Sequence, residues 1–200
     1  MAHHFAASSA ADERSLRRAS AFAAGWAAIY GIYRGYYAVG GTAGMLGVPV
    51  SESEFRYINA VAAIALAGAA VLPVLLLKVW PVPRWRVVGL ALSAVIIVGC
   101  VGHALVGIGQ RVLSLTGVLT MSYPFWLTID HAKADWQALL WNEPWFLIEG
   151  LAWHAIAWAA FVRHATWRTF WIVGLVMAVT VFTMLGLLSA VGVVERVIVG

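Results

Sequence analysis

The sequence contains one cysteine, Cys100, and few charged residues. A single cysteine excludes an intramolecular disulfide and any metal site built mainly on thiolates. Charged residues make up 11% of the 200 residues, against about 25% in an ordinary soluble domain. Hydrophobic residues make up 62% and the mean hydropathy is +0.86. A soluble globule of this size cannot bury so much apolar surface, so we expect an all-α integral membrane protein that crosses the bilayer several times.

Familiar catalytic and nucleotide-binding motifs are also absent. The chain contains no Walker loop, dinucleotide fingerprint, HExxH, GxSxG or Cys-x-x-Cys sequence. The net charge is +4, but the basic residues stand mostly at the ends of apolar runs, where they set membrane topology. We therefore expect the lipid bilayer, and not a nucleic acid, as the main partner.

Five apolar runs are long enough to span a hydrocarbon core of about 30 Å, which takes about 20 helical residues. They cover residues 19–39, 57–79, 87–109, 144–162 and 169–191. Residues 1–18 are polar and charged, without a signal-peptide cleavage pattern. The sequence thus predicts a mobile cytoplasmic tail over 1–18 and a single transmembrane helical domain over 19–200.

The distribution of lysine and arginine favours a cytoplasmic N-terminus and an outer C-terminus. With that orientation eight basic residues face inward: Arg14, Arg17, Arg18, Lys78, Arg84, Arg86, Arg163 and Arg168. Four face outward: Arg56, Arg111, Lys133 and Arg196. Tryptophans are expected to form two interfacial belts, with Trp126, Trp136, Trp141 and Trp145 outside and Trp80, Trp85, Trp167 and Trp171 inside.

The segment over about 112–140 is ambiguous. Residues 112–129 carry no charge and could be read as a sixth span. However, only residues 109–111 separate them from the third run, and Tyr123-Pro124 interrupts their middle. We therefore expect a re-entrant or interfacial segment on the outer face, in which Asp130, His131 and Asp135 form a solvent-facing turn.

Polar side chains inside the apolar runs are functional candidates, because they are costly in hydrocarbon. At a rise of ~1.5 Å per residue, Arg34, His103 and Glu149 lie ~8–9 Å below the outer ends of their runs. Asn59 is shallower, and His154 lies near the membrane centre. The shared depth of the first three predicts an outward-facing polar pocket. The candidates are Arg34, Asn59, His103, Glu149 and His154.

These residues support several arrangements. Arg34 and Glu149 could form a structural ion pair, or Arg34 could hold an anionic head group or carboxylate with Glu149 as a proton acceptor. His103 and His154 could bond to neighbouring helices, ligate a b-type haem, or join Glu149 at a metal ion. The five-residue separation of Glu149 and His154 places them about 140° apart on a helix, so we predict no metal site.

Small residues recur at the spacing that lets helices approach closely. Gly31 and Gly35 form one GxxxG pair, and Gly40 and Gly44 form a second at the outer end of the first run. Both pairs are expected to serve helix packing.

Two segments carry a family resemblance. Residues 36–44, Tyr-Tyr-Ala-Val-Gly-Gly-Thr-Ala-Gly, with Val48-Pro49 after them, resemble the first-span signature of small multi-pass membrane proteins of bacteria, common in actinobacteria. Tyr37 stands where that signature has tryptophan. Residues 141–150, Trp-Asn-Glu-Pro-Trp-Phe-Leu-Ile-Glu-Gly, resemble their last third. The resemblance implies the inner membrane as location and no particular chemistry.

The expected function is binding of a lipid or small hydrophobic molecule in the outward-facing pocket, or service as an accessory membrane subunit with a protein partner or a second copy. One alternative is a membrane enzyme acting on a lipid or isoprenoid, with Glu149 or His154 as general base and Arg34 as anion clamp. A second alternative is a haem-binding electron-transfer protein. The residues name no cofactor and no specific ligand.

Overall fold

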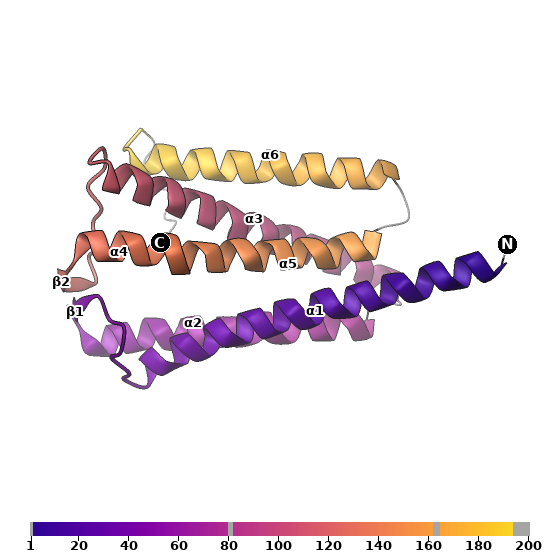
Figure 1. Cartoon of the computed structure of the whole chain (residues 1–200), viewed down its shortest axis with the longest axis horizontal. Coiled ribbons are helices and arrows are strands. Elements are labelled where there is room, and N and C mark those ends of the chain that lie inside the picture. The colour runs from indigo at the N-terminus through magenta and orange to yellow at the C-terminus, as the bar shows by residue number, and fades with distance from the viewer. Residues whose placement is uncertain (1, 80–81, 162–164, 194–200) are drawn as a thin grey trace.

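The chain folds into a bundle of long helices with one very small sheet at its end (Figure 1). The computed structural model describes residues 2–79, 82–161 and 165–193. In chain order the elements are α1 (Ala2–Ala38), β1 (Gly47–Pro49), α2 (Glu52–Val79), α3 (Pro83–Leu115), β2 (Trp126–Ile129), α4 (His131–Gln137), the π-helical turn η1 (Ala138–Asn142), α5 (Glu143–Phe161) and α6 (Ala165–Ala190). The expected all-helical class is confirmed.

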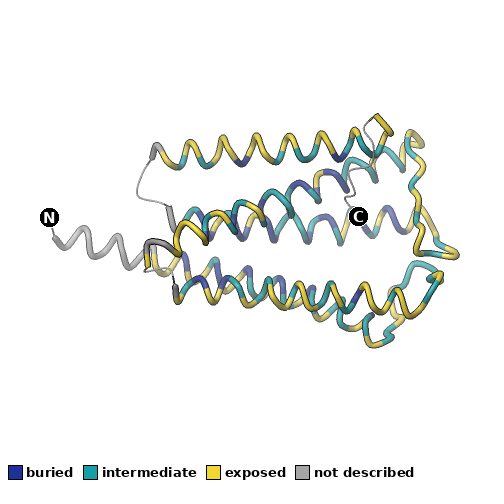
Figure 2. Tube along the Cα trace, turned by 180° about the vertical axis from the view of Figure 1, so that it is seen from behind, coloured by how far each residue is buried: buried dark blue, intermediate teal, exposed yellow. Residues whose placement is uncertain are grey.

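The helices pack in the order α2, α1, α5, α3, α6. Figure 1 shows α2 and α1 together on one side, α5 in the middle and α6 beyond α3. The outermost helices expose large apolar side chains, such as Ile64 on α2 and Phe170 on α6. The middle helices supply the largest buried side chains, Tyr30 on α1 and Trp153 on α5. Figure 2 shows how buried, intermediate and exposed residues alternate along each helix.

Among the described residues, three stretches of helix are long and apolar enough to cross a membrane: Glu52–Lys78, Trp85–Leu115 and Trp167–Ala190. They belong to α2, α3 and α6, and such helices identify a membrane protein. The central helices α1 and α5 each pack against two other long helices, α1 against α2 and α5, and α5 against α1 and α3. Tyr30 and Trp153, on the buried sides of these helices, contact protein.

The helix boundaries extend the predicted runs by a few residues at most ends. The largest difference is at the N-terminus, where the helix begins at Ala2 and includes the residues expected to form a separate tail. An ion pair between Arg17 and Glu13, at 2.6 Å and one helical turn apart, supports helix there. Some sequence assignments lie outside the described residues: Trp80, the end of the fourth run at Val162, Arg163 and Arg196.

The apolar segment after α3 is not a sixth helix. Residues 112–115 complete α3, and β2 then pairs antiparallel with β1 from the α1–α2 connection. Gly47 pairs with Ile129, and a Cβ on Gly47 would overlap the carbonyl oxygen of Thr128. The two connections are thereby joined across the end of the bundle, where Figure 1 labels β1 and β2.

The second glycine pair forms a turn and not a helix contact. Gly40 and Gly44 have φ values of 95° and 81°, which only glycine adopts without strain. The Tyr37 hydroxyl donates to the Ala43 carbonyl at 3.0 Å, and the Tyr36 hydroxyl accepts from the Ala43 amide at 2.9 Å. The expectation that Gly40 and Gly44 pack helices is wrong, because α1 ends before them.

Trp145 belongs to the core and not to an interfacial belt. Its side chain is 6% exposed and its ring stacks on Trp26 of α1, with centroids 4.0 Å apart. The Trp26 indole N–H also donates to the Trp145 carbonyl at 3.1 Å. Of the other tryptophans expected in the belts, Trp85, Trp136, Trp141 and Trp167 are exposed, whereas Trp126 and Trp171 are half-buried.

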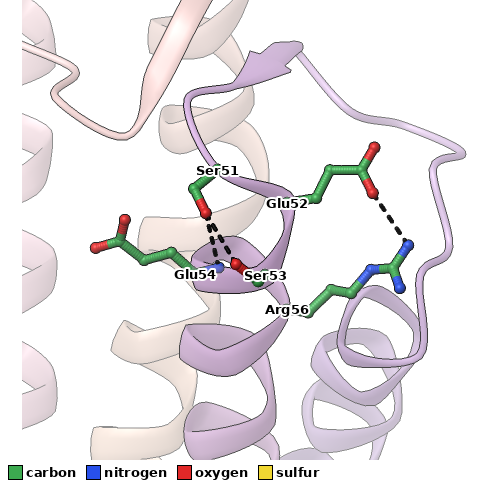
Figure 3. A network of polar contacts seen from close by, with 5 residues as sticks. All are labelled: Ser51, Glu52, Ser53, Glu54 and Arg56. Atoms are coloured by element: carbon green, nitrogen blue, oxygen red, sulfur yellow. Dashed lines mark hydrogen bonds and ion pairs between the residues drawn. The ribbon is translucent and has the colours of Figure 1, made fainter.

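The start of α2 is fixed by a side-chain cap (Figure 3). The Glu54 amide donates to the Ser51 hydroxyl at 3.3 Å, which satisfies one of the free amides at a helix N-terminus. Arg56 binds Glu52 at 3.2 Å on the exposed side. The Glu54 side chain points the other way in Figure 3, toward the site described below.

Gly31 permits the closest approach between α1 and α2, and its replacement tests that packing. A Cβ on Gly31 would lie 3.3 Å from the Leu66 Cβ, whereas one on Gly35 would have no neighbour within 4 Å. We expect Gly31→Leu to lower the free energy of unfolding in detergent by about 1–3 kcal/mol through overpacking. Gly35→Leu is the matched control. Equal stability of the two variants would contradict the close contact.

Candidate functional site

Two adjoining cavities lie at the end of the bundle that carries β1 and β2. One of about 290 Å³ is lined by α1, α2 and the two connections. The other, of about 500 Å³, lies between α1, α3 and α5 beneath residues 121–126. Their sizes are in the range of small-molecule sites. Arg34, Arg111, Tyr123, Trp126 and Asn142 line both cavities.

Arg34 contacts neutral groups in the described residues. Its Nη1 donates to Asn59 Oδ1 at 3.1 Å, and its Nη2 donates to the Tyr30 hydroxyl at 3.2 Å. Its Nε is buried with no hydrogen-bond partner among those residues. The guanidinium is therefore oriented by two hydrogen bonds while its charge is not neutralised by a contacting carboxylate.

Asn59 is the residue that orients Arg34 from α2. It is 2% exposed, and its Nδ2 donates to the Phe55 carbonyl at 2.8 Å. This bond fixes which way the amide points, so Oδ1 faces Arg34. The structure thus brings together two of the residues expected at the pocket.

Arg111, by contrast, has an acidic partner. Its Nη1 lies 3.5 Å from Asp135 Oδ1 and donates to the Tyr123 hydroxyl at 3.0 Å. Asp135 also accepts from Ser114 at 2.6 Å and from Tyr123 at 2.7 Å. These four residues, the Asp135 network, tie the end of α3 to α4 and to the segment between them.

The Asp135 network corrects one expectation about Asp135 and raises the pKa of Tyr123. Asp135 was expected in a solvent-facing turn, but it is 2% exposed, because three groups of α3 and its following segment converge on it. Burial and the hydrogen bond to Asp135 raise the pKa of Tyr123 to about 12. The hydroxyl therefore stays protonated and available as a donor at neutral pH.

His103 contacts a carboxylate that the sequence analysis did not select. Its Nε2 lies 3.8 Å from Glu143 Oε2, and its ring packs against Phe146 with centroids 4.4 Å apart. Both His103 and Glu143 line the larger cavity. Glu143 directly precedes the predicted run over 144–162 and was therefore not among the candidates inside the apolar runs. Glu143 and Gly150 are seven residues apart, a spacing that places two residues on the same face of a helix. Both face α3 in the structure, so this spacing was the signal in the sequence that could have identified Glu143.

Glu149 and His154 lie further along α5 and line neither cavity. Glu149 Oε1 accepts from the Trp153 indole N–H at 2.9 Å, and the His154 ring lies beside Trp158. Arg34 and Glu149 form no ion pair within the described part of the chain, since each contacts other groups. The two cavities together are therefore lined by three of the five expected residues, Arg34, Asn59 and His103.

The positions of the histidines do not suit one haem. His103 packs against residues 143–146 of α5, while His154 is eight residues beyond Phe146, or ~12 Å along the helix. Two axial ligands must lie on opposite sides of the same iron. Where residues are described, no three His, Cys, Asp or Glu side chains are grouped as a metal ion would require.

No protein-family model matches the chain, and no curated protein or solved structure matches it significantly. The resemblance to small bacterial membrane proteins therefore stays a prediction.

Asp135→Asn tests whether the Asp135 network stabilises the end of the bundle. The substitution removes a buried negative charge and leaves Arg111 without its partner, so we expect the free energy of unfolding to fall by about 3 kcal/mol. Asp130→Asn is the control, because Asp130 caps α4 through Lys133 N and asparagine caps equally well. Denaturant unfolding in detergent measures both. Similar stabilities for the two variants would show that the network contributes little.

Proposed function

We propose that the chain is a multi-pass protein of the bacterial inner membrane that binds an anionic lipid or small molecule in an outward-facing pocket. Arg34 carries this proposal. It lines both cavities, it is held in place by Asn59 and Tyr30, and its charge has no contacting carboxylate among the described residues. A preorganised guanidinium of this kind suits a carboxylate or phosphate, which it can bind through two parallel hydrogen bonds.

The proposed topology has five spans, with the N-terminus inside and the C-terminus outside. The helices α1 and α5 complete the set of α2, α3 and α6, because both lie alongside them within one bundle. The 19 residues of α5 extend ~28 Å, close to the thickness of the hydrocarbon core. The excess of lysine and arginine on the inner side supports the orientation.

Labelling with a membrane-impermeant maleimide tests this topology. In a Cys100→Ala background, we expect Lys133→Cys to react from outside in spheroplasts and Arg17→Cys to react only after permeabilisation. Both positions are exposed in the fold. Reaction of Lys133→Cys only after permeabilisation would place residues 130–137 inside and overturn the proposed orientation.

Native mass spectrometry of the protein purified gently from its own membrane tests the binding proposal. We expect a discrete bound anionic mass, and a reduction of the bound fraction by about tenfold or more in Arg34→Gln. Arg56→Gln is the matched control, since Arg56 is an exposed arginine on α2 paired with Glu52. A bound mass that Arg34→Gln retains would contradict the proposal. A clean apo mass would direct attention to a protein partner instead.

A further inference from the structure

Glu143 is a buried carboxylate at the wall of the larger cavity. The residue is 4% exposed, and its Oε2 has no hydrogen-bond partner among the described residues. The nearest charged or chargeable group recorded is His103 Nε2, at 3.8 Å. A buried carboxylate is costly unless it is paired and hydrogen-bonded. The contact with His103 is too long for a hydrogen bond, so the carboxylate can take a further cationic partner from a ligand.

The neighbouring helix leaves room for this carboxylate. Gly107 of α3 faces it, and a Cβ at that position would overlap the Glu143 carboxyl group. Aromatic rings flank the same space, because Phe146 packs edge-on against Tyr30 with centroids 5.9 Å apart. A carboxylate bordered by aromatic faces suits an ammonium group, which both kinds of group attract.

Arg34 and Glu143 line the same cavity with opposite charges, yet form no ion pair with each other in the described residues. They are connected through neutral groups. Tyr30 accepts from Arg34 at 3.2 Å and donates to Asn142, the neighbour of Glu143, at 3.5 Å. Arg111, the other cation at this cavity, is already paired with Asp135.

We propose that this cavity binds a zwitterionic ligand, in which an anionic group contacts Arg34 and a primary ammonium group contacts Glu143. The chemical class is that of an ethanolamine phosphate, either as a phospholipid head group or as a free solute. The inference depends on the proposed anion site at Arg34 and adds the cationic half of the ligand. His103 lies beside Glu143 and completes the lining there.

A comparison of two lipids on the purified protein tests the zwitterion. Native mass spectra are recorded with dilauroyl phosphatidylethanolamine and with dilauroyl phosphatidylglycerol, which has the phosphate but no ammonium. For the unmodified chain we expect retention of the ethanolamine lipid to exceed that of the glycerol lipid by about tenfold. Dilauroyl phosphatidylcholine, whose quaternary ammonium cannot donate a hydrogen bond, should bind more weakly than the ethanolamine lipid.

Glu143→Gln should remove the preference for the ethanolamine lipid over the glycerol lipid, so that the protein retains both to the same extent. The matched control is Glu149→Gln, because Glu149 is also a buried carboxylate of α5 but lines neither cavity. This control should keep the preference. Arg34→Gln should lose both lipids. If Glu143→Gln fails to fold, the lipid series on the unmodified chain still decides the question.

Soluble glycerophosphoethanolamine distinguishes the source of the ligand. Displacement of the bound lipid by this head group at millimolar concentration supports a free solute, and retention of the lipid supports a phospholipid. Equal binding of the ethanolamine and glycerol lipids by the unmodified chain overturns the zwitterion. If that equal binding still depends on Arg34, the anion site stands. If neither lipid depends on Arg34, the proposed function fails as well.

Discussion

The cost of placing charged and polar groups in an apolar bundle governs the arrangement of this protein. Each such group needs a partner inside the fold, since hydrocarbon offers none. The helices that carry most of these groups, α1 and α5, therefore occupy the middle of the packing order, between α2 on one side and α3 on the other. Tyr30 shows the consequence, because one buried hydroxyl links Arg34 of α1 with Asn142 at the start of α5.

Two sets of charged side chains lie at the end of the bundle that carries β1 and β2. They differ in whether their charges are matched by opposite charges inside the protein. The Asp135 network is closed, because Arg111, Ser114 and Tyr123 all meet one carboxylate. Such a network serves to hold the chain segments that carry it. Arg34 and Glu143 are open. Arg34 is oriented by Asn59 and Tyr30 and contacts no carboxylate among the described residues. Glu143 has His103 beside it at 3.8 Å, and its Oε2 accepts no hydrogen bond there. Groups that are fixed but not neutralised are suited to binding, because the ligand supplies what the protein lacks.

The sequence predicted the helices well and their lateral neighbours poorly. Hydropathy and length located all five long helices to within a few residues at most of their ends, because both follow directly from the bilayer thickness. Depth along a helix placed Arg34, Asn59 and His103 at one end of the bundle. Glu143 was left out because it directly precedes the predicted run over 144–162. Depth also says nothing about rotation, so Glu149 was selected although it lines neither cavity. The burial of Asp135 and Trp145 was missed because both depend on which helix lies alongside.

The apolar residues after α3 show why hydropathy alone misleads at this site. Residues 116–129 are apolar enough to suggest a span, yet they form an extended connection that ends in β2. Phe125 and Trp126 of this segment line both cavities, and Tyr123 joins the Asp135 network. Their apolar character serves to cover the polar groups of the site from one end. An ionic contact made beside this apolar cover is partly shielded from water, so it is stronger than the same contact in solvent.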